Sequence, residues 1–392
     1  MHSINSDIAS IQAVLQHLSL ERSSLEKSYD AHVSVLSPIR RLPNELLSEI
    51  FLSRGHDILF PAETLPSLTN LYDDSLWLIL QVCALWRSIA LSTPLFWNSF
   101  LIDLTLLKGK PANYACLQMR LQLCLSHSGI LPLNFGVIGT HNHDSTNLVP
   151  IITTLCSHSP NWANVYFCPH ATTILASWLP ASYRHLSTPQ LISLGLTSFN
   201  PFRGFIQTSP ILFNHTPSLT RLALHDYRAR ENSTTTASSS FSSSLSFLPS
   251  FCRHLTHLYL SSCPYYTYDD ILPHVPSLTH LETFNKYQHS TRSPTITPIP
   301  LPNLITFKST GWLNNLCFLL PHLQIPSIRQ IDIITLEEEC HPCTCGVVKR
   351  RIINEWIHTL GEGVHATIVD ASAEDVGTSA DNNVIGFLFS GI

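Results

Sequence analysis

The chain has 392 residues, of which 44% are hydrophobic and 12% are charged, and its formal net charge is −5. This length can bury one large core or two to three smaller ones, and the lack of a basic block argues against nucleic-acid binding. No apolar run approaches the ~18 residues of a membrane span, and the N-terminus lacks the basic and apolar regions of a secretory signal.

The first segment, residues 1–37, carries apolar residues at heptad spacing. The spacing begins Ile4, Ile8, Ile11, Leu15 and predicts one helix of about thirty residues that stops at a following proline. Two partners for the stripe stay open. One is another helix, including a second copy of this chain in a homodimeric coiled coil. The other is the rest of the chain, which Arg22 and His32 favour because they interrupt the seam.

Residues 38–105 predict a helical module with an insertion near residues 53–75. A short helix is expected over residues 45–51, directly after Leu42-Pro43, because a proline fits the turn into a helix. Beyond the insertion, apolar residues give a second helical stripe over residues 80–90. The sequence Pro94-Leu95-Phe96-Trp97 closes it.

Four ordered elements of this module resemble an F-box. They are Leu42-Pro43-Asn44-Glu45-Leu46, Ile50-Phe51, Val82-Cys83-Ala84-Leu85-Trp86-Arg87 and Pro94-Leu95-Phe96-Trp97. With the preceding heptad helix, the chain resembles the F-box-like proteins that fungi, and mushrooms above all, encode in large numbers. The resemblance implies docking on a Skp-type adaptor of an SCF ubiquitin ligase.

The adaptor-binding residues that the resemblance implies are apolar or aromatic, with one proline and one cysteine. They are Leu42, Pro43, Leu46, Leu47, Ile50, Phe51, Val82, Cys83 and Trp86. The alternative is that the same side chains attach the module to the chain that follows. Leu47 and Phe51 fit an internal face equally well.

Residues 106–370 contain a degenerate L-x-x-L-x-L repeat whose copies mostly begin roughly 20–30 residues apart, as in leucine-rich repeats. Copies begin at Leu191, Leu219, Leu255, Leu278, Leu304 and Ile328, with an earlier candidate at Trp162. Each copy predicts one short strand, and the strands should stack as a parallel sheet. The fold class is therefore α/β, a solenoid with strands on its concave side and helices or loops on its convex side, similar to the horseshoe of many F-box receptors.

Further segments complete the predicted solenoid. A first strand is expected over residues 130–139 and a convex helix over residues 148–159. A helix over residues 347–360 should end at Gly361, followed by a strand over residues 364–369. The Ser-rich insertion near residues 228–250 and the tail 371–392 show no folding pattern.

Neither a metal site nor a cofactor is predicted. "CHPCTC" offers Cys340, His341, Cys343 and Cys345, but one tight cluster cannot easily supply the two separated ligand pairs of structural zinc. Glycine-rich phosphate loops and nucleophile motifs are missing from the sequence. Eleven scattered cysteines in a chain without a signal predict reduced thiols and a cytoplasmic or nuclear location.

The sequence therefore favours a non-enzymatic substrate receptor of an SCF-type cullin-RING ligase. A Skp-type adaptor and an unknown protein target are the expected partners, with no nucleic acid and no membrane. The residues between the repeat leucines, such as Arg221, His257 and Glu282, have mixed polarity and suggest a protein target. The alternative is a protein-interaction scaffold in which the F-box-like helices cap the solenoid.

Overall fold

The computed structural model divides the chain into two compact units, Met1–Arg54 and Gly55–Ile392, each of which we describe by itself. The structure describes residues 2–36, 38–55, 75–107, 110–139, 145–177, 186–198, 216–226, 250–261, 271–285, 298–312, 316–317, 319–336, 345–361 and 363–371. The predicted helical module over residues 38–105 falls partly in each unit. Most of the Ser-rich insertion and most of the predicted tail lie outside the described residues.

The first unit is helical. Helix α1 (His2–Leu36) confirms the predicted long helix, and its side chains from residue 8 to residue 30 are all exposed. A short 3-10 turn, η1 (Pro38–Arg41), leads to helix α2 (Asn44–Gly55). The carbonyl of Pro43 accepts a hydrogen bond from the backbone N–H of Leu47 at 3.1 Å. Pro43 therefore starts α2 without losing a donor that the helix needs.

The second unit begins with two short helices where the sequence pattern predicts one stripe. Helices α3 (Ser75–Val82) and α4 (Ala84–Ser92) are separated by Cys83, whose backbone is extended with φ −160° and ψ 170°. The Arg87 Nε donates to the carbonyl of Leu80 at 2.8 Å. This bond satisfies a carbonyl near the end of α3 that has no partner within the helix. The apolar periodicity runs through the break and therefore does not reveal it.

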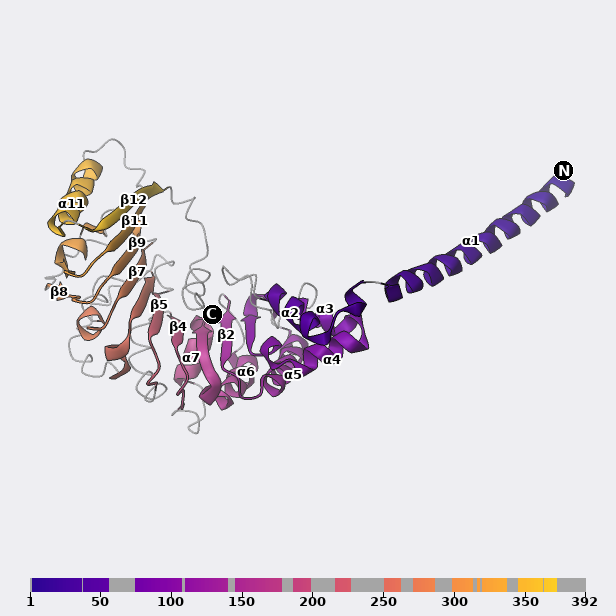
Figure 1. Cartoon of the computed structure of the whole chain (residues 1–392), viewed down its shortest axis with the longest axis horizontal. Coiled ribbons are helices and arrows are strands. Elements are labelled where there is room, and N and C mark those ends of the chain that lie inside the picture. Colours follow the sequence, from indigo (N-terminus) through magenta and orange to yellow (C-terminus); the bar gives the residue numbers. More distant parts are fainter. Residues whose placement is uncertain are drawn as a thin grey trace. The chain divides into compact units, whose positions relative to one another are not determined.

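The main feature of this unit is a parallel sheet, which is ten-stranded over the described part of the chain. Its strands are β1 (Ser99–Asp103), β2 (Leu133–Ile138), β3 (Trp162–Phe167), β4 (Ser193–Ser198), β5 (Arg221–Asp226), β6 (His257–Ser261), β7 (His280–Asn285), β9 (Thr306–Trp312), β11 (Gln330–Leu336) and β12 (His365–Ala371). They lie side by side in chain order (Figure 1). Such an order is the signature of a solenoid, because each repeat contacts its neighbours in sequence.

The predicted repeat strands are confirmed, and within the main sheet β1 is the strand that the sequence pattern missed. Strand β1 lies within the range assigned to the helical module and follows the 3-10 turn η2 (Pro94–Phe96) almost directly. It has no full L-x-x-L-x-L copy, although Phe100, Leu101 and Ile102 are all buried. A small second sheet pairs β8 (Ile299–Pro300) with β10 (Leu323–Gln324).

The connections between strands change along the sheet. Helices α5 (Pro111–Ser128), α6 (Ser145–Ser157) and α7 (Pro169–Ser177) follow β1, β2 and β3. They pack against one another in sequence (Figure 1), and α6 confirms the predicted helix near residues 148–159. Later connections contain short 3-10 turns: η8 (Ser250–His254), η9 (Leu272–His274) and η10 (Leu320–His322). Helix α11 (Cys345–Thr359) precedes β12, and Gly361 follows it at φ +90°, as predicted.

One face of the sheet forms the hydrophobic core. The register aligns a buried row across consecutive strands: Phe100, Phe135, Val165, Leu194, Leu222, Leu258, Leu281, Phe307 and Ile331. The Phe100 and Phe135 rings stack at 5.6 Å between centroids. Full burial of such a side chain contributes about 1.5–3 kcal/mol, so this row is a main source of stability.

A recurring turn leads into the repeat strands. In the turns that end at Leu219 and Leu278, the leucine N–H donates to the carbonyl three residues earlier, and a proline occupies the second position. Proline presets the backbone angle required there in a type I or type II turn. Neighbouring turns are joined as well, because the Ser218 hydroxyl donates to the carbonyl of Pro189 at 2.8 Å.

Candidate protein-docking surfaces

Helix α2 presents two of its predicted docking residues to solvent. Leu46 is 51% exposed and Ile50 is 41% exposed, and their spacing of four residues places them on one helix face. Pro43 before the helix is also exposed. A leucine and an isoleucine in water leave an apolar surface that a partner protein could cover.

The other predicted residues of this segment are less accessible. Leu47 and Phe51, also four residues apart, are buried, and Leu42 is half-buried. Leu47 and Phe51 therefore belong to the internal face that the sequence allowed for them. We leave both out of the docking surface, because a buried side chain cannot contact a partner without local unfolding.

Helices α3 and α4 expose a second apolar set. Val82 is 57% exposed, while Cys83 and Trp86 are half-buried. Two further residues, Leu78 and Leu85, are exposed, and the sequence reasoning did not select them. The spacing of four between Leu78 and Val82 was the signal that could have found the first of them.

Aromatic packing positions α4 on the start of the solenoid. The Trp97 indole N–H donates to the carbonyl of Ala90 at 2.8 Å, and the Trp97 side chain is fully buried. Its ring meets Trp77 of α3 edge-on at 6.1 Å and the imidazole of His127 of α5 at 5.1 Å. The guanidinium of Arg120 lies 4.6 Å from the centre of the Trp77 ring. These contacts hold α3 and α4 on a rigid support, as a docking surface requires.

The sheet face opposite the core row carries polar side chains in register. One row runs Arg221, His257, His280, Thr306, Gln330 and His365 over six consecutive strands from β5 to β12. The next row includes Tyr259, Glu282, Lys308 and Asp332. Of the residues that the sequence placed on this face, Arg221, His257 and Glu282 are half-buried, whereas Ala223 and Tyr259 are buried.

Two histidines of this face stack on each other. The imidazole rings of His257 and His280 are 4.2 Å apart and nearly parallel, with an interplanar angle of 2°. Burial, followed by the charges of His280 and Arg221, lowers the pKa of His257 to about 4. Burial also lowers the pKa of His280, with Arg221 and Lys308 acting in the same direction. Both rings are therefore neutral near pH 7.

Threonines fix the orientation of these rings. The Thr256 hydroxyl donates to the carbonyl of Thr220 at 3.2 Å and lies 2.9 Å from Nδ1 of His257. One repeat later, the Thr279 hydroxyl donates to the carbonyl of Thr256 at 2.9 Å and lies 2.8 Å from Nδ1 of His280. Each hydroxyl has a single proton, so a hydroxyl that donates to the carbonyl accepts a hydrogen bond from Nδ1. In that arrangement the neutral ring carries its proton on Nδ1.

The structure does not gather a metal site among the residues it describes, where no group of three or more His, Cys, Asp or Glu side chains converges. Cys340, His341 and Cys343 lie outside the described residues, and Cys345 begins α11. Burial raises the pKa values of the Cys156 and Cys252 thiols to about 12. Both remain protonated at neutral pH and are poor nucleophiles. Within the described segments, none of the helices is long and apolar enough to cross a membrane.

Comparisons with known proteins add little to this description. The scan of protein-family models found no match, and the search of curated proteins found none either. Among solved structures, the chain is similar to the leucine-rich repeat-containing protein LegL7 from Legionella pneumophila. That match has 14% identity and a TM-score of 0.39, and it covers 74% of this chain and 91% of LegL7. At that score the likeness carries no argument, so the repeat fold of this chain rests on its own strand order and register.

Proposed function

We propose that this protein is a substrate receptor of an SCF-type cullin-RING ubiquitin ligase. In this proposal α2, α3 and α4 dock on a Skp-type adaptor, and the parallel sheet binds a protein target. The observation that carries the proposal is the exposure of apolar side chains at the F-box-like positions Leu46, Ile50 and Val82. A soluble partner that covers these side chains would gain about 25 cal/mol for each Å² of apolar surface removed from water.

The helices and the sheet differ in which apolar side chains they expose, and this difference supports the proposal. The aligned apolar row from β1 to β11 is buried in the sheet's own core, where neighbouring repeats cover one another. Among the large hydrophobic strand residues of this sheet that the structure describes, only Ile368 and Val369 of the last strand, β12, are exposed. Helix α4 instead turns Leu85 toward solvent and is anchored through Ile89 and Ala90, which are buried. An anchored helix with an apolar outer face suits the binding of another protein.

The proposed activity is positioning, and this chain supplies no chemical step. A receptor that holds its target beside a charged ubiquitin-conjugating enzyme raises the effective concentration of the two reactants. The rate of ubiquitin transfer then depends on how long the target stays bound and on where its lysines lie. No residue of this chain needs to act as acid, base or nucleophile.

Co-purification with a recombinant Skp-type adaptor tests the proposal. The full chain should form a stoichiometric complex, and the double variant Leu46→Asp with Val82→Asp should lose it. Both side chains are exposed, so the variant should fold as the wild type does. The matched control is Ile130→Asp, which changes a residue that is 88% exposed and lies outside the F-box-like elements. This control should keep the complex.

A second candidate is an interaction scaffold, favoured by the packing of Trp97 that joins α4 to the start of the sheet. In that role α3 and α4 cap the solenoid, and the exposed helix α1 pairs with a second copy of the chain. A folded wild-type chain that binds no adaptor and forms a dimer, lost on removal of α1, would support the scaffold. The same result would overturn the receptor proposal.

A further inference from the structure

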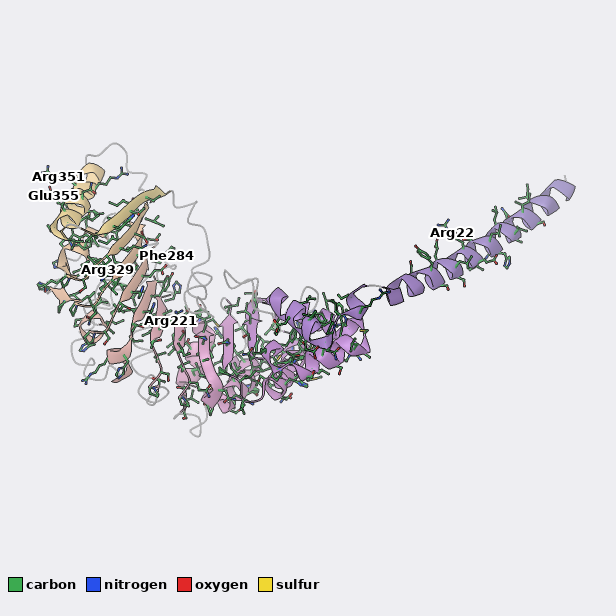
Figure 2. All side chains as sticks on the ribbon, in the orientation of Figure 1. Arg22, Arg221, Phe284, Arg329, Arg351 and Glu355 are labelled. Atoms are coloured by element: carbon green, nitrogen blue, oxygen red, sulfur yellow. The ribbon has the colours of Figure 1, made fainter. Side chains whose placement is uncertain are left out.

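The sheet strip formed by Arg221, His257, His280 and Lys308 combines fixed positive charge with two neutral histidines. Arg221 lies on β5 (Figure 2), and the register places His257 and His280 on the next two strands in the same row. Lys308 on β9 is exposed and lies in the adjacent row. The row of Lys308 also contains two carboxylates, Glu282 on β7 and Asp332 on β11, which are in register with it.

Burial is the main cause that lowers the pKa of each histidine ring. Arg221 acts in the same direction on both rings, and Lys308 acts so on His280. An anion bound against Arg221 and Lys308 would offset these charges and raise both pKa values. A ring could then take up a proton while its Nδ1 stays hydrogen-bonded to the neighbouring threonine hydroxyl.

We propose that this strip binds an acidic segment of the target protein, and that binding strengthens as the pH falls. The inference rests on the proposed role of the sheet as the target-binding part. A carboxylate that approaches Arg221 and Lys308 forms charge-assisted hydrogen bonds. The row of single residues on successive strands suits an extended segment laid across the sheet, with acidic side chains over the strip.

The sign of the pH dependence follows from proton linkage. In the unbound protein the pKa of His257 is about 4, and burial lowers the pKa of His280 as well. An anion bound beside the rings favours their charged form, so binding takes up protons as the pH falls. Affinity therefore rises as the pH falls from neutral toward about 5, where the acidic side chains of the ligand are still ionised.

Other titratable groups lie in the same rows of this sheet face and enter the test. They are Tyr259 on β6, Glu282 on β7, Asp332 on β11 and His365 on β12. Burial raises the pKa of the Glu282 carboxyl, against the opposing effect of Lys308. Protonation of Glu282 would also remove repulsion toward an acidic ligand. Asp332 accepts a hydrogen bond from the Gln330 side chain at 2.7 Å.

The test titrates the full chain with a short fluorescein-labelled Ser/Glu peptide, followed by anisotropy at constant low salt. The Ser/Glu peptide should bind, whereas a Ser/Gln peptide of equal length should not. Affinity should increase about threefold or more from about pH 7.5 to about pH 5.5. Equal binding of the Ser/Gln peptide, or no binding of the Ser/Glu peptide, would overturn the proposal.

Variants distinguish the contribution of the cationic residues of the strip from that of its histidines. Lys308→Gln and Arg221→Gln should weaken binding at both pH values. His257→Gln with His280→Gln should keep binding at the higher pH and lose the gain on acidification, and Glu282→Gln should keep most of that gain. The control Arg253→Gln removes an exposed charge of η8 and should change nothing. A pH gain that survives in the double histidine variant would contradict the assignment.

Adaptor binding, measured on the same samples, separates this inference from the receptor proposal. A chain that binds adaptor but ignores the Ser/Glu peptide overturns the acidic-target inference and leaves the receptor proposal standing. A chain that binds the peptide in the expected pH-dependent way but binds no adaptor supports the strip and overturns the ligase assignment.

Discussion

Leu46 on α2 and Leu258 on β6 are the same residue type in opposite surroundings. Leu46 is half exposed, whereas Leu258 is completely buried and stands in register with Leu222 and Leu281 of the neighbouring strands. The difference shows where each region obtains its stability. The sheet completes its core by repetition, because each strand covers the next. The exposed face of α2 has no such neighbour in register, and in the receptor proposal a partner protein covers it.

The largest predicted effect follows from this contrast. Leu258→Ala should lower the free energy of unfolding by about 2–5 kcal/mol, through lost burial and the cavity that remains. Leu46→Ala should change it by less than about 0.5 kcal/mol. Urea unfolding followed by circular dichroism measures both variants. Similar losses for the two would show that α2 depends on Leu46 for its fold, and would break the comparison.

A buried polar pair inside the sheet gives the second effect. The Thr283 and Ser309 hydroxyls are hydrogen-bonded at 2.6 Å across β7 and β9, and both side chains are buried. Thr283→Val should cost about 1–3 kcal/mol, because it leaves the Ser309 hydroxyl unsatisfied. Adding Ser309→Ala should restore part of that loss. If the double variant is as unstable as the sum of the single ones, the pair has no coupling and the hydrogen bond contributes little.

The smallest effect concerns the opposite face of the sheet and depends on pH. His257 has a folded pKa of about 4 against an ordinary value of 6.5, so the unfolded chain binds more protons between these values. Stability is therefore complete above pH 6.5 and falls as the pH drops through 6.5 toward 4. The expected loss is only about 1 kcal/mol, because the half-exposed ring is screened by water.

Thermal unfolding at several pH values measures this loss, and His257→Gln is the matched variant. The glutamine side chain does not titrate, so the variant should lose less stability than the wild type on acidification. An identical pH dependence in the two proteins would mean that other groups, and not His257, cause the loss of stability at low pH.

Much of the solenoid could be predicted from the sequence because its signals are local. The L-x-x-L-x-L pattern specifies a short strand with one buried face. The prolines before these copies specify a turn through the backbone angle that they impose. Strands β3 to β11 of the main sheet were predicted for these reasons, whereas β2, β12, α6 and α11 were predicted as separate segments outside the repeat copies. Strand β1 was missed because it has no complete copy of the pattern.

Only the tertiary structure shows which of these side chains are buried and which are exposed to solvent. Helical spacing alone could not separate Leu46 and Ile50, which are exposed, from Leu47 and Phe51, which are buried, because both pairs are four residues apart. The break at Cys83 was equally hidden, since apolar periodicity continues through it.

The stacking of the two histidines could not be predicted from the sequence, for a related reason. His257 and His280 are 23 positions apart, as are the threonines that precede them, and only the parallel register brings the rings to 4.2 Å. The sequence by itself determined the repeat, its strands and its turns, because these depend on neighbours along the chain. Which side chains are buried, and which meet across strands, was decided by the tertiary structure, because burial and contact depend on residues far apart in the sequence.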